Sequence, residues 1–272
     1  MKILIIGKNS RITQFLKEYL DKDFSISIKG YSELIKKDSL YFKKYKFIIN
    51  CSSNTKFVKS KYDASNDYDY KIAKKIIRLK TSYIFLSTRK VYKPKESCKE
   101  TDKTQPLCNY SKNKLITENK LKKILKNRLI ILRISNVIGI TKKNSKKKLH
   151  NTFIDIFFKN IKKGFIVNNQ KVFKDFISSK KLGQVISKLI KINARGTYNL
   201  SIGGKVYLNN IVQWLNHYNP NSYKIVNHDK FNFNNDSFYL NNDKILKKTK
   251  IRISISNLKT ECKKISKKYF LN

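Results

Sequence analysis

The chain has 272 residues, of which 40% are hydrophobic and 12% are aromatic, so it can bury a core and is not an intrinsically disordered polymer. With only 8 Gly and 3 Pro, it is neither collagen-like nor of low complexity. Its 61 Lys and Arg against 18 Asp and Glu give a formal net charge of +43, which by itself points to a polyanionic partner such as nucleic acid.

The distribution of this charge argues against a dedicated nucleic-acid protein. Lysine is spread along almost the whole chain and arginine is scarce, whereas proteins that read bases or phosphates usually gather both on one element. We interpret the lysines as filling solvent-facing positions, and we expect no specific nucleic-acid partner. Non-specific binding to polyanions at low salt would still follow.

The cysteines and the N-terminus exclude other classes. Cys51, Cys98, Cys108 and Cys262 contain no C-x-x-C pair and the three histidines stand far apart, so neither a metal site nor a disulfide framework is predicted. The first apolar run ends at Gly7 and is too short for a signal peptide or a membrane span. We therefore expect a cytoplasmic protein without a membrane partner.

The chain begins with the pattern of a strand followed by a helix. Residues 3–6 form a continuous apolar run, and residues 12–20 then place apolar side chains at helical spacing. Similar short apolar runs recur at residues 24–28, 47–49, 83–86 and 129–132, with helix-like segments at about 67–80 and 111–126. Strands that alternate with helices predict βαβ units and a parallel sheet.

The pattern changes after about residue 140, where the lysine-rich segment 142–148 predicts an exposed loop. Further elements are predicted as helices at about 151–163, 180–192, 207–217 and 257–269, and as strands at about 165–167 and 197–200. We predict an α/β fold in which residues 1–140 form a Rossmann-type, doubly wound parallel sheet that binds a dinucleotide. Residues 141–272 are predicted to form a smaller, mainly substrate-binding part, with some segments returning to the first domain.

The first turn of this pattern is a candidate phosphate site. Gly7 follows a strand directly, and Ser10, Arg11 and Ile12 open the next helix, whose free amides can face a pyrophosphate. Any parallel α/β protein can place a glycine after its first strand, so the turn alone leaves a purely structural interpretation open.

A second candidate site combines a strand end with a helix. The apolar run at 83–86 leads into Ser87 and Thr88, and Tyr110 and Lys114 are four residues apart, so they share one helix face. A phenol with an ordinary pKa of about 10 needs a nearby cation to exchange protons near neutrality. Tyr and Lys are frequent here, so this spacing also arises by chance, but its place after a strand that ends in Ser-Thr favours a catalytic role.

These residues resemble the extended short-chain dehydrogenases/reductases, also called the NAD-dependent epimerase/dehydratase family. The resemblance covers nearly the whole chain. It is carried by Gly7, Asn50-Cys51-Ser52, Ser87-Thr88, Val91-Tyr92, Tyr110, Lys114, the segment LRISNVIG at 132–139, Lys174-Asp175-Phe176-Ile177 and the segment GTYNL at 196–200.

The resemblance implies a role for each matching residue. It makes Tyr110 the catalytic acid/base, Lys114 the residue that lowers the pKa of the phenol and holds the nicotinamide ribose, and Thr88 the residue that orients the substrate. Asn136 and Lys174 match positions that approach the diphosphate of a nucleotide sugar. The implied cofactor-binding residues are Gly7, Ser10, Arg11, Ile12, Lys29, Asn50, Cys51, Ser52, Tyr110 and Lys114.

The chain departs from the glycine fingerprint of the family, G-x-x-G-x-x-G, at its second and third positions. These positions hold Ser10 and Thr13, whose Cβ atoms restrict close approach of the backbone to a phosphate and of the helix to the sheet. Because Thr88, Tyr110 and Lys114 are all present, we still expect a bound cofactor.

The choice between NADP and NAD rests on few residues. No acidic residue ends the second strand, and Lys29 and Arg11 could receive a 2′-phosphate, which favours NADP slightly. A solvated Lys29 without a ligand fits the sequence equally well.

The resemblance therefore implies an NAD(P)-dependent oxidoreductase or epimerase that acts on a nucleotide-activated sugar. The chain length resembles the dTDP-4-dehydrorhamnose reductase type more than the longer epimerases, and Arg89 and Lys90 stand where dehydratases of the family keep acidic residues. The resemblance also allows a homodimer, because many members of the family form dimers through two helices. The alternatives are an inactive Rossmann-fold scaffold that binds polyanions or proteins, and a nucleic-acid binder.

Overall fold

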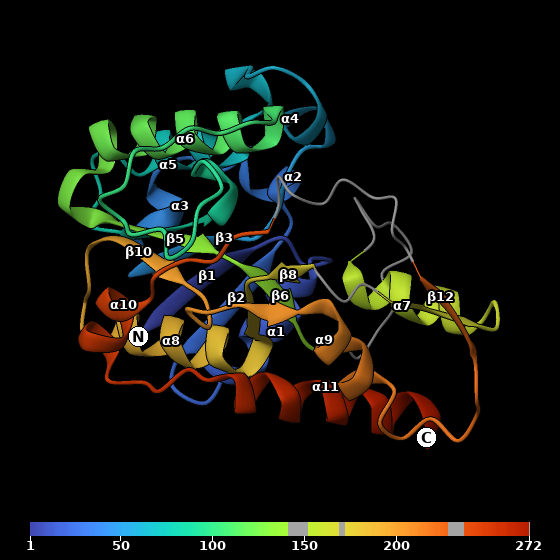
Figure 1. Cartoon of the computed structure of the whole chain (residues 1–272). Helices are drawn as coiled ribbons and strands as arrows, with labels where there is room; N and C mark the ends of the chain where they lie inside the picture. Colours follow the sequence, from blue (N-terminus) through green and yellow to red (C-terminus); the bar gives the residue numbers. More distant parts are fainter. Residues whose placement is uncertain (141–151, 169–171, 228–236, 272) are drawn as a thin grey trace.

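A computed structural model describes residues 1–140, 152–168, 172–227 and 237–271 (Figure 1). The loop that the sequence predicts at 142–148 lies outside these described residues.

A six-stranded parallel sheet forms the centre of the molecule, with the strand order β10-β5-β4-β3-β1-β2. Its strands are β1 (Lys2–Ile6), β2 (Ser25–Lys29), β3 (Phe47–Asn50), β4 (Ser82–Thr88), β5 (Leu129–Ile134) and β10 (Gly196–Leu200). The strand order reverses between β1 and β3, as in doubly wound dinucleotide-binding sheets. The predicted α/β fold with a Rossmann-type parallel sheet is confirmed.

Helices cover both faces of this sheet (Figure 1). On one face lie α2 (Tyr31–Leu34), α3 (Leu40–Lys43), α4 (Thr55–Lys59), α5 (Tyr68–Lys75) and α6 (Asn109–Leu125). On the other face lie α1 (Arg11–Leu20), α8 (Ser179–Lys191), α9 (Leu208–Leu215), α10 (Asp243–Thr249) and α11 (Ile255–Phe270). Three short 3-10 helices, η1 (Ala64–Asn66), η2 (Arg89–Val91) and η3 (Lys126–Arg128), join some of these elements.

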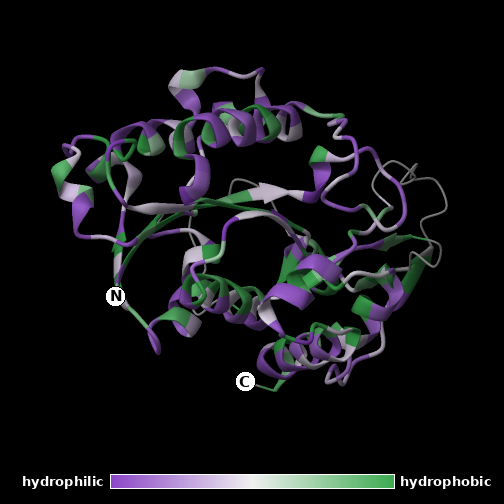
Figure 2. Cartoon of the chain, turned by 90° about the vertical axis from the view of Figure 1, so that its left-hand side faces the viewer, coloured by the Kyte–Doolittle hydropathy of each residue, from purple (hydrophilic) through white to green (hydrophobic). Residues whose placement is uncertain are grey.

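The apolar side chains of the strands pack into two separate hydrophobic cores, one on each face of the sheet. In β1, Ile3 and Ile5 face a core that contains Leu16 of α1, whereas Leu4 and Ile6 face a second core on the α5 and α6 side. Successive strand residues point to opposite faces, so a strand buried on both faces reads as a continuous apolar run. Hydrophobic residues gather along the central strands and hydrophilic residues lie on the outer faces of the helices (Figure 2).

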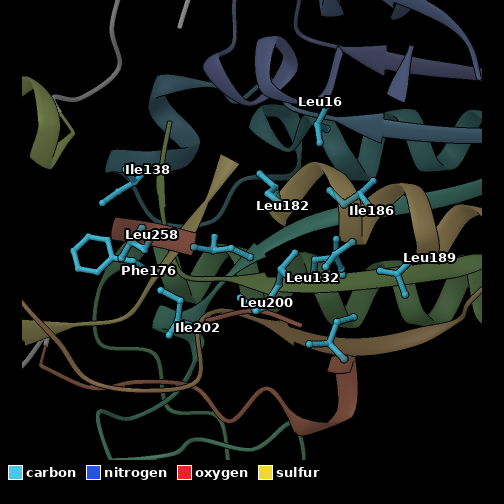
Figure 3. Close-up of a cluster of buried hydrophobic side chains, with 14 of the residues drawn as sticks. Leu16, Leu132, Ile138, Phe176, Leu182, Ile186, Leu189, Leu200, Ile202 and Leu258 are labelled. Carbon is cyan, nitrogen blue, oxygen red and sulfur yellow. The ribbon is translucent and has the colours of Figure 1, made fainter. Parts of the chain in front are cut away.

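The larger core joins the sheet to the later part of the chain. In Figure 3, Leu132 of β5 and Leu200 of β10 lie in one cluster with Ile186 and Leu189 of α8 and with Leu258 of α11. Because β10 is an edge strand of the main sheet and α8 packs against α1, residues after 152 contribute to the main sheet and to its helical layer as well as forming separate elements.

The remaining elements of the later part are small. They are α7 (Phe153–Ile161), and the strand pairs β6 (Asn136–Ile138) with β9 (Phe176–Ser178), β8 (Phe173–Lys174) with β11 (Val206–Tyr207), and β7 (Phe165–Asn168) with β12 (Lys224–Asn227). Among the described residues, no helix combines the length and apolar character needed to cross a membrane.

Candidate active site

The turn after β1 brings three strand ends together at Gly7. Its φ is +107°, a conformation that favours glycine, and a Cβ there would lie 2.9 Å from the backbone nitrogen of Ser52. The Gly7 amide donates to the Lys29 carbonyl at 2.8 Å, which ties the turn to the end of β2. Close approach of the segment after β3 therefore requires glycine at this position.

The N-terminus of α1 is suited to an anion. Ser10 is the N-cap, its side chain makes no capping hydrogen bond, and the first turn holds no acidic residue. The first amides of a helix have no partner within the helix, so those after Ser10, including those of Arg11 and Ile12, can donate to a phosphate.

Thr13 occupies the third fingerprint position without obstructing this turn. Its side chain is buried, at 2% exposure, and its hydroxyl donates to the Gly7 carbonyl at 2.7 Å. It also lies within hydrogen-bonding reach of the Cys51 thiol, whose pKa burial raises to about 12, so Cys51 is a neutral thiol near pH 7. The threonine thus points beneath the turn, and the residues present fit a dinucleotide above it.

The side chains that the sequence assigns to the cofactor have different surroundings. The Arg11 guanidinium donates to Asp155 Oδ1 at 2.7 Å and to Thr152 Oγ1 at 3.0 Å, so it joins α1 to α7. Lys29 is exposed at the end of β2. Beside it, Lys8 Nζ lies 3.2 Å from Glu33 Oε1, a carboxylate near the second strand end that the sequence analysis missed.

The end of β3 is built around the side chain of Asn50. Its Oδ1 accepts from the Ser52 amide at 3.0 Å and from Ser52 Oγ at 2.6 Å, and the side chain also bonds Asp69. The Cys51 amide donates to the Ile6 carbonyl at 2.8 Å, which extends the pairing of β3 with β1. Asn50, Cys51 and Ser52 therefore form the wall of the turn at Gly7.

Tyr110 and Lys114 lie on α6, which packs against β4 and η2, the two elements that meet at Thr88. Thr88 ends β4, and Tyr110 and Lys114 lie one turn apart near the start of α6. Tyr110 is partly exposed, whereas Lys114 is 7% exposed, with its Nζ 4.6 Å from the centre of the Phe85 ring of β4. Tyr110 is therefore open to a ligand while the cation is held beneath it.

The two hydroxyl residues at the end of β4 have different partners. Ser87 Oγ donates to Glu118 Oε1 at 2.5 Å inside the protein, whereas Thr88 Oγ1 accepts from the Lys90 amide at 3.3 Å. Ser87 is thus committed to a buried network, which leaves Thr88 as the hydroxyl suited to a ligand.

Glu118 is the centre of that network and was missed from the sequence. Arg133 Nη2 lies 2.8 Å from Glu118 Oε2, and Arg133 Nη1 donates to the Tyr92 hydroxyl at 2.7 Å. That hydroxyl in turn donates to Asn199 Oδ1 at 2.9 Å. The network joins α6, β5 and β10, and no local pattern predicts it, because Glu118 and Arg133 are 15 positions apart on different elements.

Asn136 and Lys174, the residues assigned to the substrate, lie on β6 and β8, two small strands that belong to different two-stranded sheets. Asn136 pairs in register with Phe176, and its Nδ2 donates to the Asp175 carbonyl at 2.9 Å. Lys174 is partly exposed, two residues before Phe176. The structure therefore places these two residues near each other.

Arg89 and Asp175 are two further buried ionisable residues. The Arg89 guanidinium lies 4.1 Å from the centre of the Phe238 ring, and Asp175 Oδ2 accepts from the Leu240 amide at 2.8 Å. Burial raises the pKa of Asp175 to about 7, although the charge of Arg89 opposes this. Both residues hold the segment around Leu240 beside the residues that follow Thr88.

The described part of the chain also shows how candidate metal ligands are arranged. No group of three or more His, Cys, Asp or Glu side chains there is arranged to hold a metal ion, and the four cysteines are free thiols.

Several solved structures share this fold. The dTDP-4-dehydrorhamnose reductase of Clostridium acetobutylicum has a TM-score of 0.75 at 18% identity, with 96% of this chain and 98% of that chain covered. The reductase of the same name from Bacillus anthracis, in complex with NADP, has a TM-score of 0.78 at 16% identity, with 99% and 98% covered. UDP-N-acetylglucosamine 4-epimerase from Methanobrevibacter ruminantium, in complex with UDP-N-acetylmuramic acid, has a TM-score of 0.79 at 15% identity, with 98% and 97% covered.

At such low sequence identities, the similarity to these solved structures shows only a shared fold. The family is shown instead by a match of the sequence to a family model. No curated protein matches the chain. A family model described as the RmlD substrate binding domain matches residues 1–201, which confirms the resemblance to reductases of the dTDP-4-dehydrorhamnose type. Because this match spans most of the chain, the protein belongs to the RmlD substrate binding domain family.

Proposed function

We propose that the chain is an NAD(P)-dependent reductase or epimerase that acts on a nucleotide-activated sugar. One observation carries the proposal: the buried ammonium of Lys114 lies one helical turn from the partly exposed Tyr110, at the end of the strand that carries Thr88. This arrangement lies at the same edge of the sheet as the Gly7 turn and the open N-terminus of α1, because the carboxyl ends of parallel strands meet there.

In the proposed reaction, the cofactor and the side chains supply different steps. When bound, the dinucleotide supplies or accepts the hydride. In the reductive direction, the Tyr110 hydroxyl donates its proton to the carbonyl oxygen of the sugar, and the Lys114 ammonium stabilises the phenolate that remains. Thr88 donates a hydrogen bond to the same oxygen and holds it for proton transfer. In an epimerase, Tyr110 would first accept the proton of a sugar hydroxyl and later return it.

The substrate class is proposed from the second part of the site. Asn136 and Lys174 supply an amide and a cation near each other, and such groups suit the diphosphate of a nucleotide sugar. The epimerase and reductase neighbours act on UDP- and dTDP-linked sugars by their names, in agreement with this assignment.

The cofactor is proposed to be NADP or NAD. The exposed Lys29 and Lys8 favour a 2′-phosphate at the end of β2, whereas the Glu33 carboxylate favours a free ribose hydroxyl. Titration of the purified protein with NADPH and NADH, followed by the fluorescence of the reduced nicotinamide, separates these two preferences.

The reaction is tested by a screen of dTDP- and UDP-linked sugars and 4-keto-sugars with both cofactors. Net loss of absorbance by the reduced nicotinamide identifies a reductase, and isomerisation of the sugar without net change in the cofactor identifies an epimerase. Failure to bind either cofactor at moderate salt would overturn the proposal in favour of an inactive scaffold.

A further inference from the structure

Asp69, the second residue of α5, is a buried carboxylate that faces the candidate catalytic lysine. It is 4% exposed, and its Oδ2 lies 3.7 Å from Lys114 Nζ. The two charged groups come from neighbouring helices that pack side by side. A buried charge requires a partner, and Lys114 is the oppositely charged group in contact with Asp69.

The other neighbours of Asp69 fix the direction of its carboxylate. Tyr83 of β4 donates its hydroxyl to Asp69 Oδ1 at 2.9 Å, and the Asn50 side chain also bonds the carboxylate. Oδ1 is thus held toward the strands while Oδ2 is directed to α6. Asp67 at the cap of the same helix acts on Asp69 electrostatically, and the Asp69 charge in turn helps to raise the pKa of the Cys51 thiol after β3 and of the Tyr31 phenol of α2.

Asp67 is also buried but has a structural role of its own. Its Oδ1 accepts from the Tyr70 amide at 2.9 Å as the N-cap of α5, and its Oδ2 accepts from Thr117 Oγ1 at 2.6 Å and from the Tyr62 hydroxyl at 3.0 Å. The two carboxylates, two residues apart, therefore differ: Asp67 caps a helix, and Asp69 contacts the lysine.

The ion pair with Asp69 restrains the Lys114 ammonium, but it is not a direct hydrogen bond. A separation of 3.7 Å is longer than a hydrogen bond, so the contact orients the ammonium mainly through charge. The stem and head of Lys114 also lie against two aromatic rings, with Nζ 4.6 Å from the centre of Phe85 and 5.7 Å from that of Phe57. The ammonium is thus confined by two aromatic rings and a carboxylate.

We propose that Asp69 is a positioning residue for the reaction: its carboxylate holds the Lys114 ammonium beneath Tyr110 and offsets part of the positive charge that Tyr110 experiences. The proposal rests on the proposed function of Tyr110 and Lys114. Its consequence is that the charge of Asp69 adjusts the acidity of the phenol through the lysine.

The two charges affect each other in opposite senses. Burial raises the pKa of Asp69 to about 6, although the Lys114 charge opposes this. Burial lowers the pKa of Lys114, but Asp69 and then Tyr110 and Asp67 raise it by more, so the lysine stays protonated near neutrality. Above about pH 6 an ionised Asp69 therefore offsets the lysine charge, and Asp69→Asn removes that offset in this pH range.

The test is the ionisation of Tyr110, followed as the difference in tyrosinate absorbance between each protein and its Tyr110→Phe counterpart. In the Asp69→Asn background we expect the midpoint to move to lower pH by about one unit, because the uncompensated ammonium favours the phenolate. Asp67→Asn is the matched control, and we expect a clearly smaller shift because Asp67 does not contact the lysine. An unchanged midpoint in Asp69→Asn, or an equal shift in Asp67→Asn, would overturn the proposal.

Asp69→Glu provides a second variant, which keeps the negative charge. Its midpoint should stay within about 0.3 unit of the parent, because a carboxylate still faces the lysine. A shift as large as that of Asp69→Asn would contradict the proposal. If Asp69→Asn does not fold, Asp69→Ser removes the same charge with a smaller side chain and should give the same shift to lower pH.

Kinetics add a readout that depends on the proposed function. If the protein reduces a keto-sugar, the alkaline fall of kcat should begin about one unit lower in Asp69→Asn, with little change in KM. Absence of turnover with every sugar would count against the proposed function alone, because the absorbance titration tests Asp69 without a substrate.

Discussion

Thr13 Oγ1 donates a 2.7 Å hydrogen bond to the carbonyl oxygen of Gly7, so the residue at the third fingerprint position ties the first turn of α1 to the end of β1. A glycine at that position would permit closer packing but could not form this bond. The threonine hydrogen bond therefore holds the phosphate turn in place of the closer packing that a glycine would permit.

Thr13→Val tests this bond because valine has nearly the same shape and lacks the hydroxyl. We expect the free energy of unfolding to fall by about 1 kcal/mol, since the Gly7 carbonyl still accepts from the Ser10 amide. Urea denaturation measures the change. Thr55→Val, at an exposed helix position, is the control and should lie within about 0.5 kcal/mol of the parent; an equal effect of both variants would argue against the role of the bond.

Arg11 and Asp155 lie 144 positions apart and join the phosphate turn to α7. A double-mutant cycle with Arg11→Gln and Asp155→Asn should give a coupling of about 1 kcal/mol, because the pair is partly buried and charge-assisted. Thermal unfolding of the four proteins measures it. Strictly additive effects would mean that α7 is held in place by other contacts.

The buried Glu118 should matter far more for stability than an exposed carboxylate. Glu118→Gln leaves Arg133 without its counter-charge inside the protein, and we expect a loss of about 3 kcal/mol in urea denaturation. Glu33→Gln breaks an exposed pair with Lys8 and should have an effect below about 1 kcal/mol. Similar losses for the two variants would contradict the assigned burial of the network.

Asp175 should make the protein less stable as the pH rises. Burial raises its pKa from 3.8 to about 7, so the folded state keeps a proton that the unfolded chain releases near pH 4. The folded state then binds more protons across this window, and the free energy of unfolding falls by about 3 kcal/mol between pH 4 and 7. Asp69, with a pKa raised to about 6, adds to the fall with the same sign.

Asp175→Asn isolates this contribution. Urea midpoints at about pH 5 and pH 8 should differ clearly less in the variant than in the parent, because asparagine does not titrate. A parent that gains stability between these two pH values would contradict the raised pKa of Asp175.

The sequence predicted the sheet because its strands are buried on both faces and read as unbroken apolar runs, as in β1. It also placed Tyr110 and Lys114 on one helix, because their spacing is local. Strands of two or three residues such as β6 and β8 were not predicted, because they are too short to show a period.

The buried charges were missed for a different reason. Asp69 stands in a polar segment that reads as a solvated helix start, and only the packing of α5 against α6 buries it beside Lys114. The contact between Arg11 and Asp155 could not be predicted from the sequence either, because residues so distant along the chain form no local pattern.

The central claim, that Tyr110 is the acid/base beside a bound dinucleotide, is tested most directly by measuring turnover and cofactor binding in Tyr110→Phe. We predict that turnover of the sugar found in the screen falls by at least about 100-fold while the affinity for the cofactor changes little, and that the control Tyr218→Phe, at an exposed tyrosine, keeps full activity. Turnover within a few fold of the parent in Tyr110→Phe would contradict the account.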